Sequence, residues 1–115
     1  MREIDNFYLS KDEPNKSCLI ALKTIIMNYS VEFTPGWKYK LPCFLHQKKI
    51  FCYLWIDKET GHPYISVNKG VHLNHPALYV GDRKNFALLF IDPNEDIPVD
   101  TIYEIFDLAM GLYKT

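Results

Sequence analysis

The sequence has little net charge and no long apolar run, and each absence excludes a class of protein. Its 13 lysines and arginines nearly balance its 14 aspartates and glutamates, so the formal net charge is −1. A chain so close to neutral has no overall electrostatic attraction to nucleic acid or to a membrane surface. Its apolar runs are far shorter than the ~20 residues of a membrane-spanning helix. We therefore expect neither a membrane nor a nucleic acid as a partner.

Catalytic and redox signatures are scarce as well. The sequence contains no Gly-x-Ser-x-Gly elbow, no phosphate-binding loop and no glycine-rich dinucleotide turn, so we expect no enzyme activity. Its cysteines are Cys18, Cys43 and Cys52, an odd number at wide spacing. The N-terminal residues also lack the apolar core of a signal peptide. Together these features predict reduced thiols and a cytoplasmic location.

The 115 residues predict a single domain, 1–115, with a core of its own. Apolar residues at three- and four-residue steps predict a helix from Pro14 to Tyr29 and a second helix that opens at Pro98. Residues 1–13 are expected to be a short lead-in. Alternating patterns predict strands at 31–39, 42–46, 50–56, 63–68 and 86–91. The last of these is apolar throughout, which predicts a central strand or one buried on both faces.

This order of elements predicts an α+β fold, an antiparallel sheet of about five strands with the N- and C-terminal helices packed on one face. Side chains alternate between the two faces of a strand. One face is therefore expected to carry Ile50, Cys52, Leu54, Ile56, Ile65 and Val67, buried under the helices. The other is expected to carry Phe51, Tyr53, Trp55, Tyr64, Ser66 and Asn68.

Rings mixed with hydroxyl and amide groups suit a shallow binding groove on that second face. The alternative is that loops 57–61 and 70–84 fold over it as a second small core. The first interpretation predicts a binding module for an unknown ligand or protein partner, without a cofactor. Its groove near the bend at Pro42 would be lined by Trp37, Tyr39, Pro42, Phe44, Tyr53, Trp55 and Tyr64. An exposed aromatic face would equally suit self-association, so a monomer and a homodimer both stay open.

The acidic C-terminal segment offers an alternative function. Asp100, Glu104 and Asp107 stand at i, i+4 and i+7 of the second predicted helix, so they share one face. Clustered carboxylates bind hard cations and could hold iron(II). The other interpretation is a solvated helix face.

Histidine and cysteine spacings give weaker signals. His72 and His75 are three residues apart, as are Cys43 and His46, whereas zinc takes four such ligands in close pairs. On a strand, Cys43 and His46 would also point to opposite faces. A thiol nucleophile at Cys43 would need a histidine beside it in space.

Three motifs, in this order, resemble the YdhG-like family of bacterial domains. They are Lys38-Tyr39-x-x-Pro42-x-Phe44, Phe51-Cys52-Tyr53-Leu54 and Ile97-Pro98-x-x-Thr101-Ile102, within a resemblance that runs from about Tyr8 to Tyr113. The resemblance implies an α+β fold with a curved antiparallel sheet and helices on one face, and no enzyme activity. One branch of the family is described as a frataxin-like iron chaperone, which would correspond to the iron(II) alternative.

Overall fold

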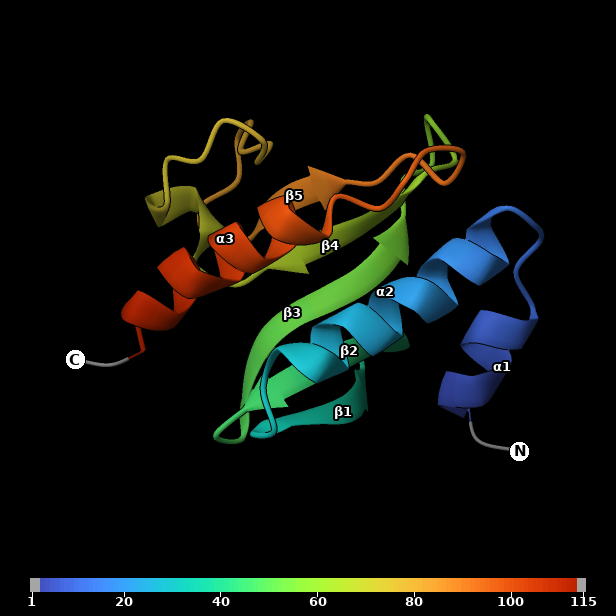
Figure 1. Ribbon diagram of the computed structural model, residues 1–115, viewed down its shortest axis with the longest axis horizontal. Coiled ribbons are helices and arrows are strands. Elements are labelled where there is room, and N and C mark those ends of the chain that lie inside the picture. Colours follow the sequence, from blue (N-terminus) through green and yellow to red (C-terminus); the bar gives the residue numbers. More distant parts are fainter. Residues whose placement is uncertain (1–2, 114–115) are drawn as a thin grey trace.

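The computed structural model describes residues 3–113, which form an open antiparallel sheet with helices on one face (Figure 1). The elements are α1 (Glu3–Leu9), α2 (Asn15–Tyr29), β1 (Phe33–Lys38), β2 (Leu41–His46), β3 (Lys49–Ile56), β4 (Pro63–Val67), the 3-10 helix η1 (Gly70–His72), β5 (Ala87–Phe90) and α3 (Val99–Gly111). Within these residues the strands lie in chain order, each antiparallel to the next. The predicted α+β fold is confirmed. None of the helices between residues 3 and 113 is long and apolar enough to cross a membrane.

Two tight turns set the register of the first three strands. The turn Tyr39-Lys40 has φ angles of 56° and 61°, and the turn Gln47-Lys48 has φ angles of 52° and 69°. Two-residue turns with both φ angles positive match the natural twist of the strands that they join. As a result, His46 is the last residue of β2 and lies opposite Phe33 of β1.

The main core lies between the sheet and the helices α2 and α3, which cross the same face (Figure 1). Its fully buried side chains include Leu19, Leu22 and Ile26 from α2, Ile102, Ile105 and Phe106 from α3, and Cys52, Leu54, Ile65 and Val67 from the sheet. Each large aliphatic or aromatic side chain buried here stabilises the fold by roughly 1.5–3 kcal/mol. The predicted burial of Cys52, Leu54, Ile65 and Val67 under the helices is therefore confirmed.

The predicted side of Phe51 is wrong. Strict alternation puts it on the far face with Tyr53, but its ring is fully buried in the main core, 5.0 Å from the ring centre of Phe106. The cause is a bulge between β2 and β3. Phe44 pairs with Cys52 while Leu45 pairs with Ile50, which leaves Phe51 as an extra residue. An extra residue interrupts the alternation, so Phe51 and Cys52 both reach the same core.

The expectation that residues 1–13 form only a lead-in is also wrong, because Glu3–Leu9 is the helix α1. Its residues Phe7 and Tyr8 are buried, and the Phe7 ring stacks on Trp55 at 5.7 Å. A helix of this length is not stable alone. Packing against the sheet therefore stabilises it, and that packing is invisible in the local sequence.

Strand β5 is buried but not central. Ala87, Leu88 and Leu89 are all buried, as predicted for an apolar strand, yet β5 is the last strand of the sheet. A single bridge continues the sheet beyond it: Tyr79 N donates to Leu88 O at 2.8 Å and Leu88 N donates to Tyr79 O at 3.0 Å. This contact covers part of an edge that would otherwise be open to pairing.

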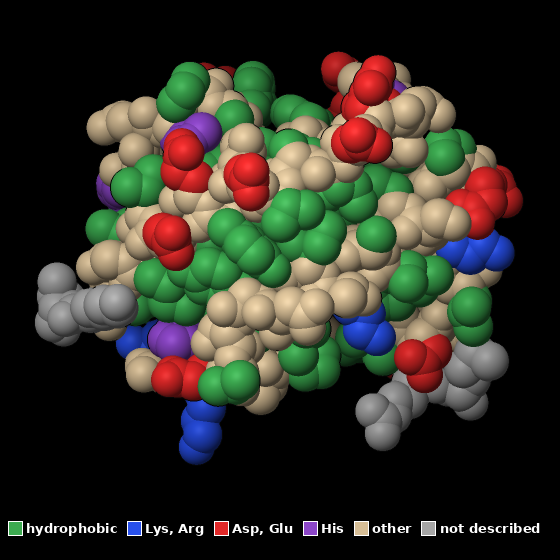
Figure 2. Space-filling model, viewed as in Figure 1, with side chains coloured by type: hydrophobic (Ala, Val, Ile, Leu, Met, Phe, Trp, Pro, Cys, Tyr) green, Lys and Arg blue, Asp and Glu red, His purple; other side chains and the backbone are tan. Residues whose placement is uncertain are grey.

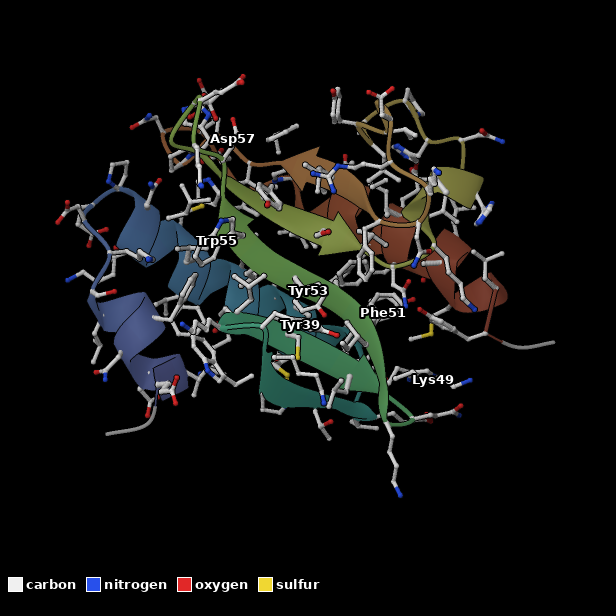
Figure 3. All side chains as sticks on the ribbon, turned by 180° about the vertical axis from the view of Figure 1, so that it is seen from behind. Tyr39, Lys49, Phe51, Tyr53, Trp55 and Asp57 are labelled. Atoms are coloured by element: carbon white, nitrogen blue, oxygen red, sulfur yellow. The ribbon has the colours of Figure 1, made fainter. Side chains whose placement is uncertain are left out.

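On the far face of the sheet, Tyr53 is the best-buried ring, with 8% of its surface exposed. It packs between Tyr39 of the first turn and Phe86, which ends the segment before β5. Figure 3 views the molecule with the sheet in front of the helices, and Tyr39 and Tyr53 lie on the viewer's side. Tyr39 itself is 82% exposed. The far face therefore carries a small aromatic cluster, with no helix layer of the described chain over it.

The position of Phe51 gives a stability prediction. Replacing Phe51 with alanine should lower the free energy of unfolding by about 3–5 kcal/mol, because it opens a cavity in the main core. The same substitution at Phe90, an edge-strand ring that is 39% exposed, should cost about 1 kcal/mol. Urea unfolding followed by circular dichroism measures both variants. Equal losses of unfolding free energy in the two variants would contradict the bulge, because they would mean that the Phe51 ring lies on an open face.

Candidate functional site

The seven aromatic and proline residues predicted to line one groove lie in different parts of the fold. Phe44 is buried in the core under the helices, with 1% of its surface exposed. Tyr39 and Tyr53 lie together on the far face, and Tyr64 contacts Phe90 at 5.8 Å near the opposite edge. Pro42 is buried in β2 opposite Trp37. The described structure thus brings some of these residues together in pairs but does not unite all seven.

Trp37 and Trp55 both pack against α1. Both rings contact Phe7, and Trp37 Nε1 donates a hydrogen bond of 3.1 Å to Glu3 of the same helix. The ammonium of Lys11 lies 4.6 Å from the centre of the Phe7 ring. These contacts attach α1 to the sheet, so the two tryptophans have a structural role here whether or not a ligand also touches them.

The acidic residues of α3 follow its outer surface, where Figure 2 shows acidic side chains beside an apolar strip. Glu104 Oε1 lies 2.6 Å from Nε2 of His75, and Asp107 accepts a hydrogen bond of 2.5 Å from the hydroxyl of Tyr29. Asp100 is exposed in the first turn. Among residues 3–113, no three His, Cys, Asp or Glu side chains lie close enough to hold a metal ion. The iron(II) alternative therefore has no preformed site in the described part of the chain.

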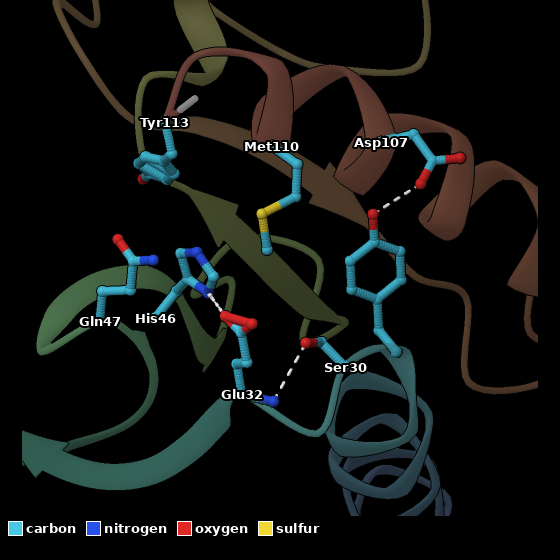
Figure 4. A pocket seen from close by; sticks show the side chains of 8 residues that line it. Ser30, Glu32, His46, Gln47, Asp107, Met110 and Tyr113 are labelled. Carbon is cyan, nitrogen blue, oxygen red and sulfur yellow. Dashed lines mark hydrogen bonds and ion pairs between the residues drawn. The ribbon is translucent and has the colours of Figure 1, made fainter. Parts of the chain in front are cut away.

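A different set of side chains surrounds an open pocket of about 810 Å³ where β2, α2 and α3 end (Figure 4). We call it the His46 pocket; its lining is Tyr29, Ser30, Glu32, His46, Gln47, Asp107, Met110 and Tyr113. Two carboxylates, two hydroxyls, an amide and an imidazole face a wall of Met110 and Tyr113. A concave site with an apolar wall and several converging polar groups is typical of small-ligand sites.

His46 is held firmly at the centre of this pocket. Its ring stacks on Tyr113 with centres 5.9 Å apart and meets Phe33 edge-on at 6.0 Å. Only 12% of the side chain is exposed. The ring therefore lies between two aromatic neighbours, Phe33 and Tyr113.

Two polar atoms beside the pocket are buried without a hydrogen bond. Of the three such side-chain atoms in residues 3–113, two are His46 Nδ1 and the hydroxyl of Tyr113. The nearest carboxylate oxygen, from Glu32, lies 4.0 Å from Nδ1, which is beyond hydrogen-bonding distance. A buried polar group left unpaired costs about 1–3 kcal/mol. Both atoms have almost no exposed surface, so they belong to the wall of the pocket and are not contacts offered to a ligand in its opening.

Burial and hydrogen bonding also shift the tyrosines of the pocket. Burial raises the pKa of Tyr113. For Tyr29, burial and then the hydrogen bond to Asp107 raise the pKa well above its ordinary value. Both phenols therefore stay protonated at neutral pH, and the Tyr29 hydroxyl already donates its hydrogen to Asp107.

Sequence reasoning considered His46 only as a partner of Cys43, and it missed this pocket. In the structure Cys43 is fully buried and lies outside the main core cluster, whereas the ring of His46 packs against Phe33, a member of that cluster. The pocket's other polar residues come from the end of α2, the α2–β1 loop, the β2–β3 turn and the C-terminal part of the chain at α3. No local motif joins these segments, so the sequence held no signal for the site.

Comparisons of this chain with models of protein families, with curated proteins and with solved structures found no match. The resemblance to the YdhG-like family thus stays a prediction, and the argument about function depends on the geometry of the site.

The three cysteines should be unreactive in the native protein. All three are buried and unpaired in disulfides. Burial raises the pKa of the Cys43 thiol, although the charge of Lys38 acts against it, and burial raises that of Cys52 further. Since only the thiolate reacts, iodoacetamide at pH 7 should label the native protein slowly and the urea-unfolded protein completely, as mass spectrometry would show. Rapid labelling of native Cys43 would instead support a thiol nucleophile.

The contact between Tyr29 and Asp107 predicts a dependence of stability on alkaline pH. The pKa of Tyr29 is raised in the folded state, so above about pH 10 the unfolded chain loses this proton first. The free energy of unfolding should therefore be unaffected by this group below that pH and should fall as the pH rises above it.

In a Tyr29→Phe variant, the free energy of unfolding should fall less steeply between pH 8 and pH 12, as measured by chemical denaturation. The Asp107→Asn variant keeps a hydrogen-bond acceptor but removes the charge. Its slope of unfolding free energy against pH should lie between those of Tyr29→Phe and the wild type. Identical slopes for all three proteins would mean that this contact does not form in solution.

Proposed function

We propose that this protein is a non-catalytic binding module that holds a small polar ligand in the His46 pocket. The observation that carries the proposal is the lining of an open pocket of about 810 Å³, which joins the carboxylates of Glu32 and Asp107 and the imidazole of His46 to an apolar wall. A ligand with hydrogen-bonding groups would meet several polar side chains and an apolar surface in this pocket at once.

The kind of function is the one expected from the sequence, but the site differs from the predicted aromatic groove. In its favour, the His46 pocket combines an apolar wall with polar groups of several kinds, whereas the predicted groove residues lie apart. Glu32 and Asp107 favour a ligand with a positively charged or hydrogen-donating group, since both carboxylates face the same opening. Gln47 and Ser30 offer further hydrogen bonds.

The proposal is tested by an NMR screen of small amines, amino acids and carboxylic acids against the native protein. A ligand of this site should shift the imidazole signals of His46 and the ring signals of Tyr113. His46→Phe keeps a ring between Phe33 and Tyr113 but removes both nitrogens, so affinity should fall about tenfold or more. Each ligand should also be recovered chemically unchanged.

The matched control is His72→Phe, the same substitution at an exposed histidine of η1. It should leave affinity unchanged. The proposal is wrong if no compound shifts the pocket signals, or if His46→Phe binds as tightly as the wild type. Conversion of a bound compound would instead show an enzyme.

A further inference from the structure

A second, smaller pocket adjoins the first and has the opposite charge. It has a volume of about 150 Å³, and its lining is His46, Gln47, Lys49, Lys69, Leu112 and Tyr113. Three of these residues, His46, Gln47 and Tyr113, also line the His46 pocket. Beyond these shared walls, one pocket offers the carboxylates of Glu32 and Asp107 and the other offers two ammonium groups. We call the second one the lysine pocket.

The lysines of this pocket have no carboxylate partner in the described chain. Between residues 3 and 113, both ion pairs within 4.0 Å involve a histidine, so neither Lys49 nor Lys69 is paired. The ammonium of Lys69 lies instead 4.6 Å from the centre of the Tyr113 ring, the same ring that stacks on His46. The ring face attracts the cation but does not neutralise it.

The backbone holds Lys69 in this place. Its φ is 63°, in the left-handed region that residues other than glycine seldom adopt. The backbone N–H of Lys69 donates to Asn85 Oδ1 at 3.0 Å, and Asn85 in turn donates to Asn68 at 2.9 Å. This network holds the backbone of Lys69 next to the pocket and so sets the direction in which its side chain leaves the backbone.

From this arrangement we infer that the ligand of the His46 pocket is a small zwitterion. Its cationic group would lie near Glu32 and Asp107, and its anionic group would lie near Lys49 and Lys69, with His46 and Tyr113 between them. This inference rests on the proposed function and specifies its ligand class. A molecule with one charge would satisfy one pocket and leave the other charged groups unpaired, so both charges together favour binding.

The test uses four five-carbon probes that differ in charge: pentylamine, pentanoate, L-norvaline and δ-aminopentanoate. Affinity is measured by NMR titration of the native protein with His46 and Tyr113 as reporters. At least one of the two zwitterions should bind about tenfold or more tightly than both singly charged probes. Comparing the two zwitterions also tells how far apart the charges must be.

Variants identify which end of the zwitterion meets which pocket. The substitutions Lys69→Gln and Lys49→Gln should lower the affinity for the zwitterion about threefold to tenfold and leave the affinity for pentylamine unchanged. The substitution Asp107→Asn should lower the affinity for the zwitterion and for pentylamine alike. Lys48→Gln is the matched control, because it removes the same charge from the neighbouring turn at a residue that lines neither pocket.

The outcomes separate this inference from the proposed function. If pentylamine binds in the pocket as tightly as both zwitterions, the inference is wrong and the binding module stands. The same holds if none of the four probes binds while the broader screen finds only singly charged ligands at His46. If neither set of compounds shifts the pocket signals, both proposals are wrong.

Discussion

A cluster of aromatic rings between β1, β3 and α3 is the feature on which the rest of the structure depends. Phe51 lies at its centre, with ring centres 4.9 Å from Phe33, 5.0 Å from Phe106 and 5.7 Å from Tyr113. Rings at such distances gain more than their buried area alone, and in the pair Phe51–Phe106 the edge of one ring meets the face of the other. The bulge in β3 makes this possible, since without it Phe51 would face away from the helices.

The same cluster forms one side of the His46 pocket. Tyr113 contacts Phe51 on one side and His46 on the other, and Tyr29 contacts Phe106 at 5.2 Å while its hydroxyl binds Asp107. The pocket is therefore built on rigid core residues and not on loops alone. Because the surrounding rings are so well buried, the fold tolerates the cost of polar atoms that have no partner in the described chain.

Charged residues add little to the stability of this fold. Most lysines and carboxylates of residues 3–113 are exposed, and the ion pairs found there involve His46 and His75. Exposed ion pairs contribute about 0–1 kcal/mol each, so a fold held by apolar packing loses little by not forming them. The two pockets lie where carboxylates from the α2–β1 loop and α3 come near lysines that have no carboxylate partner among the described residues.

The sequence alone determined the features that depend on short-range periodicity. Apolar steps of three and four residues predict α2 and α3, alternation predicts the strands, and helices on either side of a run of strands predict an α+β fold. These predictions are sound because each pattern is a property of one segment, and burying its apolar side is favourable in almost any compact arrangement.

Only the tertiary structure decided which segments meet. The helix α1 is too short to form without the sheet, the side of Phe51 depends on how β2 and β3 pair, and β5 is an edge strand because of the order of the whole sheet. The pocket depends on contacts such as that between Tyr29 and Asp107, which are 78 residues apart. Such contacts are set by the packing of the complete core, and no local pattern encodes them.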